Sequence, residues 1–307
     1  MSGEGMNQKI IEFRLAEFVD RDKEIALFCQ MLKSEDKSIM VVWGEGGIGK
    51  TSLLARMLHE SSQRKLRKAE VFWNDSNPPD YMAVMRKIRD DIGVEYFTLF
   101  TDLINYYTKP GYEPIEINLT LSGADVRVAS GMQVTNASVG DIAGIVIKDN
   151  MIVVPRPDME VPEPERRDKL TRRFIEGLKK AVENEPIIVF FDAVEKMSAE
   201  TERWVWGELL YSIRNLTNIK FVLCGRKPPP DDQDWRLFVE ETGLRPLRHK
   251  DIAKYLLKRV PELGKEIESL KMFADLIEAN TDGNALKVAR EVEKLLKMKD
   301  KREHDDE

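Results

Sequence analysis

Gly44-Glu45-Gly46-Gly47-Ile48-Gly49-Lys50-Thr51 decides the fold, because this octapeptide matches the phosphate-loop pattern G-x-x-x-x-G-K-[ST] in full. Its four glycines allow backbone conformations that are closed to other residues, so that successive amides can turn inward around an anion. A helix that begins at Lys50 would direct its positive end at the same anion. The octapeptide therefore predicts a binding site for a nucleoside triphosphate.

Two side chains of the loop have separate expected roles. Lys50 should reach the β and γ phosphates as a point charge, and the Thr51 hydroxyl should take one position around Mg²⁺. The predicted nucleotide-contacting residues of this segment are Gly44, Glu45, Gly46, Gly47, Ile48, Gly49, Lys50, Thr51 and Ser52.

The flanking sequence separates this reading from a glycine-rich turn that binds nothing. Residues 38–43, Ser-Ile-Met-Val-Val-Trp, form a short apolar run typical of a fully buried strand, and residues 51–58 continue at helical spacing. A strand before the loop and a helix after it are the context that the phosphate loop requires.

Composition excludes several classes of protein. The 307 residues are 42% hydrophobic, which is enough for a sizeable core, and the two cysteines have no metal-ligand spacing. Apolar runs such as 187–191 are too short to span a bilayer, and residues 1–5 do not resemble a signal sequence, so we expect a cytoplasmic protein without a membrane partner. The net charge of −6 argues against nucleic acid as the main partner. The basic run 64–68 is either a local patch or the cationic end of a helix.

Hydrophobic patterning along the chain predicts an α/β fold with a parallel sheet flanked by helices. Together with the phosphate-loop motif, this pattern indicates a P-loop NTPase. Further strands are expected at residues 69–73, 186–191, 219–224 and, less regularly because of Pro246, 243–247. Helices are expected at residues 80–91, 164–184, 199–216, 250–259, 265–279 and 284–297.

The same pass divides the chain into regions. The NTPase core is predicted at residues 1–248, and the helices without intervening strands at 249–298 indicate a C-terminal helical lid subdomain, followed by a charged tail at 299–307. Alternating apolar residues between about 112 and 156 predict a small β insert within the core. The insert is either a decoration of the sheet or an edge for pairing with another chain.

Acidic and basic residues at the ends of later strands complete the expected site. Asp192 follows the most apolar strand and is predicted to hold Mg²⁺. Glu195 could polarise an attacking water as general base, or could lie on the surface. Arg226 follows the next strand and is predicted to bind phosphate oxygens, with a simple ion pair to an acid such as Asp231 or Asp232 as the alternative.

These motifs resemble the signal-transduction ATPases with numerous domains (STAND), the class that contains the NACHT and NB-ARC modules and is related to AAA+ and origin-recognition ATPases. Residues 18–24, Phe-Val-Asp-Arg-Asp-Lys-Glu, are similar to the F-V-G-R-x-x-E motif of that class, and residues 281–286, Thr-Asp-Gly-Asn-Ala-Leu, are similar to its lid motif G-N-P-L. Residues 224–226 look like its sensor strand end. The resemblance implies ATP as the nucleotide and places Val19 and Arg21 beside the base. Glu195 matches an acidic position that NACHT-like members carry.

The sequence thus favours an ATP-binding switch that hydrolyses ATP slowly with Mg²⁺, using Lys50, Glu195 and Arg226, and changes its assembly or protein partner with the nucleotide state. One alternative is an origin-recognition-like ATPase that acts on DNA, although no basic DNA-reading module is evident. Another is a scaffold that binds nucleotide without hydrolysing it.

Overall fold

The computed structural model describes residues 12, 14–15, 18–108, 118–119, 133–134, 146–148, 151–153, 161–231 and 233–305. The chain divides into two compact units, one of residues 1–92 and 181–307 and the other of residues 93–180. The predicted β insert of residues 112–156 lies largely outside the described residues. Within that insert, β3 (Asn118–Leu119) pairs with β4 (Gln133–Val134), and β5 (Val146–Lys148) pairs antiparallel with β6 (Met151–Val153).

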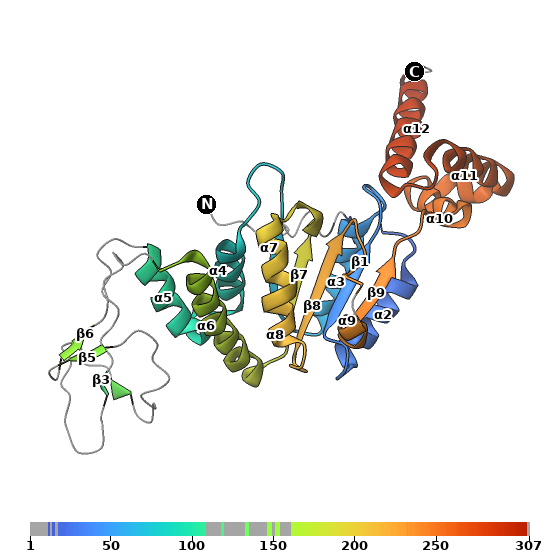
Figure 1. Cartoon of the computed structure of the whole chain (residues 1–307). Coiled ribbons are helices and arrows are strands. Elements are labelled where there is room, and N and C mark those ends of the chain that lie inside the picture. The colour runs from blue at the N-terminus through green and yellow to red at the C-terminus, as the bar shows by residue number, and fades with distance from the viewer. Residues whose placement is uncertain are drawn as a thin grey trace. The chain divides into compact units, whose positions relative to one another are not determined.

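The first unit is organised by a five-stranded parallel sheet, which confirms the predicted fold class (Figure 1). Its order is β2 (Arg67–Phe72), β7 (Ile187–Asp192), β8 (Ile219–Gly225), β1 (Ile39–Trp43) and β9 (Val239–Gly243). Strand β8 therefore lies between β1, which leads into the phosphate loop, and β7, which delivers Asp192. Because all strands are parallel, their carboxyl ends meet at one edge, where ligands of open α/β sheets bind.

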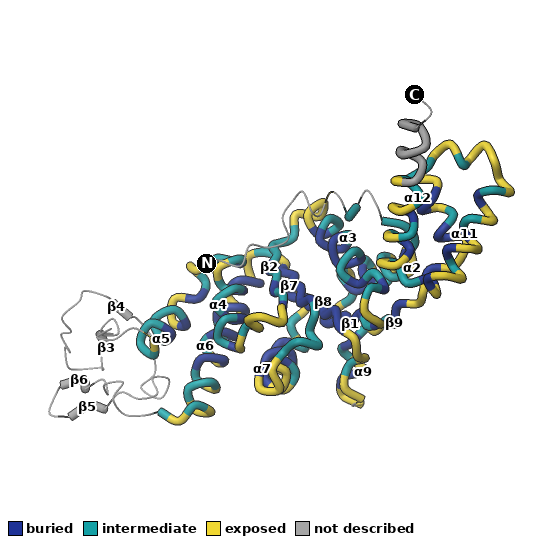
Figure 2. Tube along the Cα trace, turned by 90° about the horizontal axis from the view of Figure 1, so that it is seen from above, coloured by how far each residue is buried: buried dark blue, intermediate teal, exposed yellow. Residues whose placement is uncertain are grey.

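The three central strands form the core of this unit. Every residue of β7 and β8 is buried, as is β1 from Ile39 to Val42. This is the near-continuous apolar pattern expected of strands that are covered on both faces. Helices α2 (Asp22–Lys33) and α3 (Lys50–Gln63) lie on one face of the sheet, and α7 (Ala199–Trp204) and α9 (Gln233–Phe238) lie on the other (Figure 2). Helix α4 (Tyr81–Ile92) packs beside β2.

The helical stretch after β7 has an irregular centre. It continues from α7 through a π-helical segment at Val205–Leu210 into α8 (Tyr211–Ile213). The single helix predicted for 199–216 is therefore divided. Between β7 and α7, a short 3₁₀ turn at Val194–Lys196 carries Glu195.

The second unit has its own aromatic cluster. A 3₁₀ turn at Val94–Phe97 leads into α5 (Thr98–Thr108), and α6 (Glu163–Asn184) begins in this unit. Phe97, Phe100 and Phe174 are buried against one another, with ring centroids 5.3 Å apart for both pairs that include Phe174. Gly177 allows this packing, because a Cβ at that position would come within 2.3 Å of the Phe97 ring.

Three helices follow the sheet: α10 (His249–Arg259), α11 (Ile267–Thr281) and α12 (Ala285–Asp305), with a 3₁₀ turn at Pro261–Lys265. They share a separate apolar cluster that includes Ile252, Leu256 and Val292. Helix α12 extends beyond the predicted end at residue 297, so the backbone of residues 299–305 in the predicted charged tail is helical. The segment is rich in Lys, Glu and Arg and has no glycine or proline, which favours continuation.

The position predicted for the last strand was wrong. Strand β9 is Val239–Gly243, whereas the sequence pattern indicated residues 243–247. Pro246 cannot donate to a sheet ladder, and after Gly243 the chain leaves the sheet and continues to α10. The strand itself reads Val-Glu-Glu-Thr-Gly, and two acidic residues in five obscure its apolar pattern. Edge strands commonly carry such charges, because they discourage pairing with another chain.

Candidate nucleotide-binding site

The phosphate loop connects β1 to α3 with the backbone geometry that its glycines permit. Gly44, Gly47 and Gly49 have φ angles of 155°, 79° and 105°, and Gly49 is the residue before the first turn of α3. The Gly44 amide donates to the Gly225 carbonyl at 3.2 Å, which fixes the start of the loop to the end of β8. The loop thus lies at the ends of β1 and β8 and lines a cavity of about 530 Å³.

Residues from several separate segments of the chain line this cavity. Gly46 to Ser52 come from the phosphate loop and the first turn of α3. The other lining residues are Arg14, Phe18, Val19, Arg21, Asp192, Ala193, Glu195, Lys196, Arg226, Leu247, Tyr255, Ala285, Leu286, Val288 and Ala289. Of the residues predicted to contact nucleotide, only Gly44 and Glu45 do not line the cavity.

Lys50 does not extend into open space in this structure. Its ammonium group donates to the carbonyls of Gly44 and Glu45 at 2.8 and 2.9 Å, and the residue is only 9% exposed. Burial lowers the pKa of Lys50, against the opposing attraction of Glu195 and Asp192. The lysine therefore lies beside the loop that it is predicted to serve, and must leave these two carbonyls to reach a bound phosphate.

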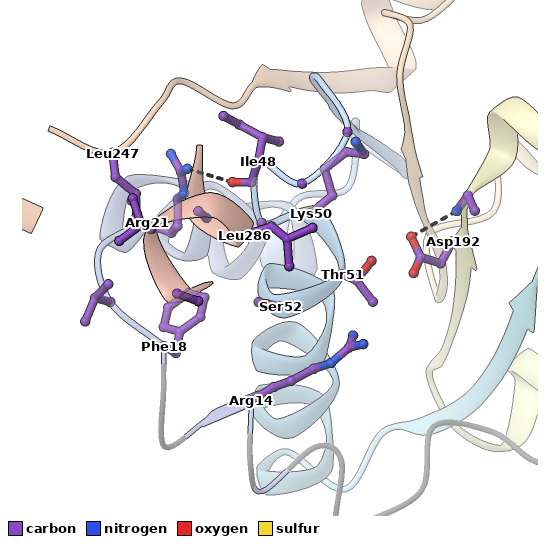
Figure 3. Close-up of a pocket in the computed structure, with 18 of the residues that line it drawn as sticks. Arg14, Phe18, Arg21, Ile48, Lys50, Thr51, Ser52, Asp192, Leu247 and Leu286 are labelled. Carbon is purple, nitrogen blue, oxygen red and sulfur yellow. Dashed lines mark hydrogen bonds between the residues drawn. The ribbon is translucent and has the colours of Figure 1, made fainter. Parts of the chain in front are cut away.

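Asp192 and Thr51 form the expected metal-binding pair. Asp192 ends β7, is 6% exposed, and accepts a hydrogen bond from the Ala193 amide at 2.9 Å. Burial raises the pKa of Asp192, and a hydrogen bond from the Thr51 side chain acts in the opposite direction. Figure 3 shows the Thr51 hydroxyl and the Asp192 carboxylate turned towards each other. Ala193 adopts a left-handed backbone conformation, with φ at 59°, which directs the chain into the turn that carries Glu195.

Glu195 and Arg226 are brought together by the ends of β7 and β8. The Glu195 Oε1 atom accepts from Arg226 Nε at 3.1 Å, and the Glu195 side chain is 17% exposed. Its other oxygen, Oε2, is buried without a hydrogen-bond partner. Glu195 is therefore mostly buried, contrary to its surface alternative. Arg226 does form an ion pair with an acid, as its alternative expected, but the acid is Glu195; Asp231 binds Arg236, and Asp232 lies outside the described residues. An unpaired buried carboxylate oxygen that lines a cavity is suited to accept a hydrogen bond from a ligand or water.

The other end of the cavity is apolar. Figure 3 shows Phe18 and Leu247 at the end away from Asp192. Val19 packs against the apolar cluster of the lid helices, and Tyr255 and Val288 of that cluster also line the cavity. This lining suits a flat base, as apolar walls usually do in ligand pockets.

Arg21 is present at the site but has a structural task. Its Nη2 atom donates to the Ile48 carbonyl at 3.1 Å and to the Arg245 carbonyl at 2.8 Å. The residue is 6% exposed and has a left-handed φ of 77°. Arg21 thereby joins the phosphate loop to the segment that leads into the lid. Arg21 lines the cavity, and its guanidinium binds protein carbonyls; its contact with nucleotide stays a prediction.

Sequence reasoning missed Arg14. This residue lines the cavity and lies close enough to Asp192 for their charges to attract, while burial lowers the pKa of its guanidinium. Arg14 matches no motif and precedes the F-V-G-R-like segment, so no sequence signal identified it. The positive charge of Arg14 partly offsets the negative charge of Asp192.

The donor set fits a hard divalent cation with a triphosphate. The oxygens of Thr51 and Asp192 are the ligand type that Mg²⁺ takes, with further positions available to water and phosphate. Within the described part of the chain, the amides of Gly46, Gly47 and Gly49 donate to no protein acceptor. Together with Lys50 and Arg226, these amides are suited to bind a polyanion at one end of the cavity.

No protein family matches the sequence, and no curated protein is similar to it. Solved structures show weak likenesses. A chain of the HORMA:CdnC:Trip13 complex of Escherichia coli MS115-1 has a TM-score of 0.46 at 11% identity, over 87% of this chain and 76% of that chain. The replication initiator DnaA, bound to AMPPCP and single-stranded DNA, has a TM-score of 0.45 at 12% identity, over 98% of this chain and 71% of that chain.

Cdc6p from Pyrobaculum aerophilum has a TM-score of 0.41 at 14% identity, over 94% of this chain and 61% of that chain. The fold assignment rests on the sheet order and the phosphate loop, and not on these likenesses. No helix in the described ranges combines the length and the apolar character needed to cross a membrane.

Proposed function

We propose that this chain is an ATP-dependent switch of the STAND type, which binds ATP with Mg²⁺, hydrolyses it slowly and changes its assembly or protein partner with the nucleotide state. The main support is that the phosphate loop, Asp192 and Glu195 line one cavity together with residues of the helical lid. A lid that shares the cavity gives a bound nucleotide a means of acting on another part of the chain.

Each polar residue has a role in this proposal. Thr51 and Asp192 hold Mg²⁺, which neutralises phosphate charge when bound. Lys50 and Arg226 bind the terminal phosphates, and Glu195 Oε2 accepts the proton of an attacking water. Glu195 and Arg226 act as the general base and a phosphate ligand, respectively.

The present partners of the two cations favour slow turnover. Lys50 binds the carbonyls of Gly44 and Glu45, and Arg226 binds Glu195. A triphosphate must exchange these partners for its own oxygens before the residues are arranged for hydrolysis. Such an exchange makes the arrangement of the site depend on the γ-phosphate, as a switch requires.

The proposal is tested by binding and turnover in matched variants. Lys50→Ala should abolish calorimetric ATP binding, because the variant loses the cation of the loop. Glu195→Gln should bind ATP as the natural protein does and release phosphate at least about 100-fold more slowly, as expected for loss of a general base. Wild-type ATP affinity in Lys50→Ala would overturn the proposal, and wild-type turnover in Glu195→Gln would remove Glu195 from the mechanism.

Particle mass measured without nucleotide, with ADP and with a non-hydrolysable ATP analogue tests the switch itself. We expect the mass, or the retention of a protein partner, to differ between the ADP and analogue states. Identical behaviour in all three states would leave an ATPase without a switch. Salt-dependent binding of DNA in the analogue state alone would instead favour the origin-recognition alternative.

A further inference from the structure

Hydrogen-bond donors from other segments of the chain bind the carbonyl groups of the phosphate loop. The Gly46 carbonyl accepts from Asn284 Nδ2 at 2.9 Å, and the Gly47 carbonyl accepts from the Leu286 amide at 2.9 Å. Asn284 and Leu286 lie at the start of α12, in the lid. Together with Arg21 on the Ile48 carbonyl, these contacts fix three consecutive peptide groups of the loop.

Peptide planarity converts these carbonyl contacts into amide orientation. In a trans peptide the carbonyl oxygen and the amide of the next residue point in opposite directions. Holding the Gly46 oxygen towards the lid therefore turns the Gly47 amide the other way, and Gly47 lines the cavity. The Gly47 amide has no protein acceptor within the described residues, so it remains available to an anion.

We propose that Asn284 is a positioning residue for phosphate binding, which holds the Gly46 carbonyl so that the Gly47 amide faces the nucleotide and thereby couples lid docking to nucleotide affinity. This inference rests on the proposed function of the cavity. Because coupling between two sites is reciprocal, a lid that prepares the loop is itself held more firmly when the loop binds phosphate.

The close fit between lid and loop supports this role. A Cβ on Gly47 would lie 2.8 Å from Asn284 Oδ1 and 3.1 Å from the Leu286 Cβ, so the lid can approach only because residue 47 is glycine. The lid also binds the linker between β9 and α10, since the Leu247 amide of this linker donates to the Gly283 carbonyl at 2.8 Å. The start of α12 is thus tied to both the loop and the linker.

The oxygen and the nitrogen of the Asn284 side-chain amide make different hydrogen bonds. A substitution can therefore remove the contact with the loop and keep the helix cap. Oδ1 accepts from the Lys287 amide at 3.3 Å and caps α12, whereas Nδ2 donates to Gly46. Serine also caps helices well but is too short to reach the Gly46 carbonyl. Asn284→Ser therefore keeps the cap and deletes the positioning contact without adding charge.

The experiment compares Asn284→Ser with Asn280→Ser, the same substitution at an exposed lid position. Calorimetry with ATP and Mg²⁺ should show about 2- to 10-fold weaker binding for Asn284→Ser, the range that one net hydrogen bond supports, and unchanged binding for Asn280→Ser. The thermal midpoint without nucleotide should be lower in Asn284→Ser than in Asn280→Ser by only about 2–4 °C, the effect of one lost hydrogen bond. Wild-type affinity in Asn284→Ser would overturn the inference while leaving the proposed function intact.

Hydrogen exchange in the natural protein provides a second test that does not depend on the variants folding. ATP with Mg²⁺ should slow exchange of the Leu286 amide at least about threefold, because this amide donates to the Gly47 carbonyl and the bound loop should hold it more firmly. Unchanged exchange at saturating ATP would refute the coupling. Failure of the natural protein and Asn280→Ser to bind ATP at all would overturn both proposals.

Discussion

Gly47→Ala adds a single carbon atom, the Cβ, where the phosphate loop contacts the lid. The residue has a φ of 79°, in the left-handed region, and its added Cβ would lie 2.8 Å from Asn284 Oδ1 and 3.1 Å from the Leu286 Cβ. The left-handed conformation costs a residue with a Cβ about 1–2 kcal/mol. Displacing Asn284 from the Gly46 carbonyl costs about 1 kcal/mol more.

The expected loss is therefore about 2–3 kcal/mol in the free energy of unfolding of the nucleotide-free protein. Urea denaturation followed by tryptophan fluorescence measures it, because all five tryptophans lie outside residues 93–180 and so report on the first unit. If the lid undocks, part of the strain is relieved. The loss of free energy of unfolding is then smaller, and the Leu286 amide exchanges faster.

Gly46→Ala is the matched control. Gly46 does not have a positive φ, and the nearest atom to an added Cβ is Arg226 Nη2 at an ordinary 3.8 Å. This variant should change the free energy of unfolding by less than about 0.5 kcal/mol, as surface substitutions usually do. Equal stability of the two variants, together with unchanged Leu286 exchange in Gly47→Ala, would refute the argument that the lid closes on a glycine of the loop.

Three further predictions concern residues around the sheet. Burial raises the pKa of the Cys224 thiol well above its usual range, so the unfolded chain loses this proton at lower pH than the folded chain. The free energy of unfolding should therefore fall as pH rises above about 8.5. Urea denaturation at about pH 7 and pH 9.5 measures this fall, which should be less steep in Cys224→Ala. Arg21→Ala should cost about 2–4 kcal/mol in urea denaturation, because the Ile48 and Arg245 carbonyls lose a charged donor; an unchanged midpoint would contradict this. Lys220→Met should lower the same free energy by about 1–3 kcal/mol, because the buried ammonium holds two carbonyls of the segment before β1, and no loss would show that water replaces it.

The sequence predicted individual strands and helices of the sheet where its signals were local. The apolar run before Gly44 and the helical spacing after Lys50 identified β1 and α3, and the run ending at Asp192 identified β7. These predictions depended on patterns within ten residues. The position predicted for β9 was wrong because its two glutamates hide the alternation of apolar residues. Helix α5 was not predicted because its segment precedes the β insert and has no predicted strand beside it.

Contacts that depend on the folded path of the chain could not be read from the sequence. Lys50 carries the motif, but its bonds to Gly44 and Glu45 follow from the folded path of the loop. Arg226 had several acids within reach in sequence, and only the three-dimensional ends of β7 and β8 select Glu195 over Asp231. Asn284 was noted as part of a lid motif, while its contact with Gly46 spans 238 positions of the chain.

These contacts have one feature in common, which bears on the switch proposed above. Lys50 binds two carbonyl oxygens of the phosphate loop, and Arg226, Asn284 and Arg21 each bind another protein oxygen beside the cavity. For Lys50 and Arg226 these oxygens compete with phosphate, so a triphosphate must displace them. For Asn284 and Arg21 the bound carbonyls turn the next amides towards the cavity, so the same contacts favour phosphate. A nucleotide would therefore break the first pair of contacts and strengthen the second, which ties the lid more tightly to the loop only when phosphate is bound.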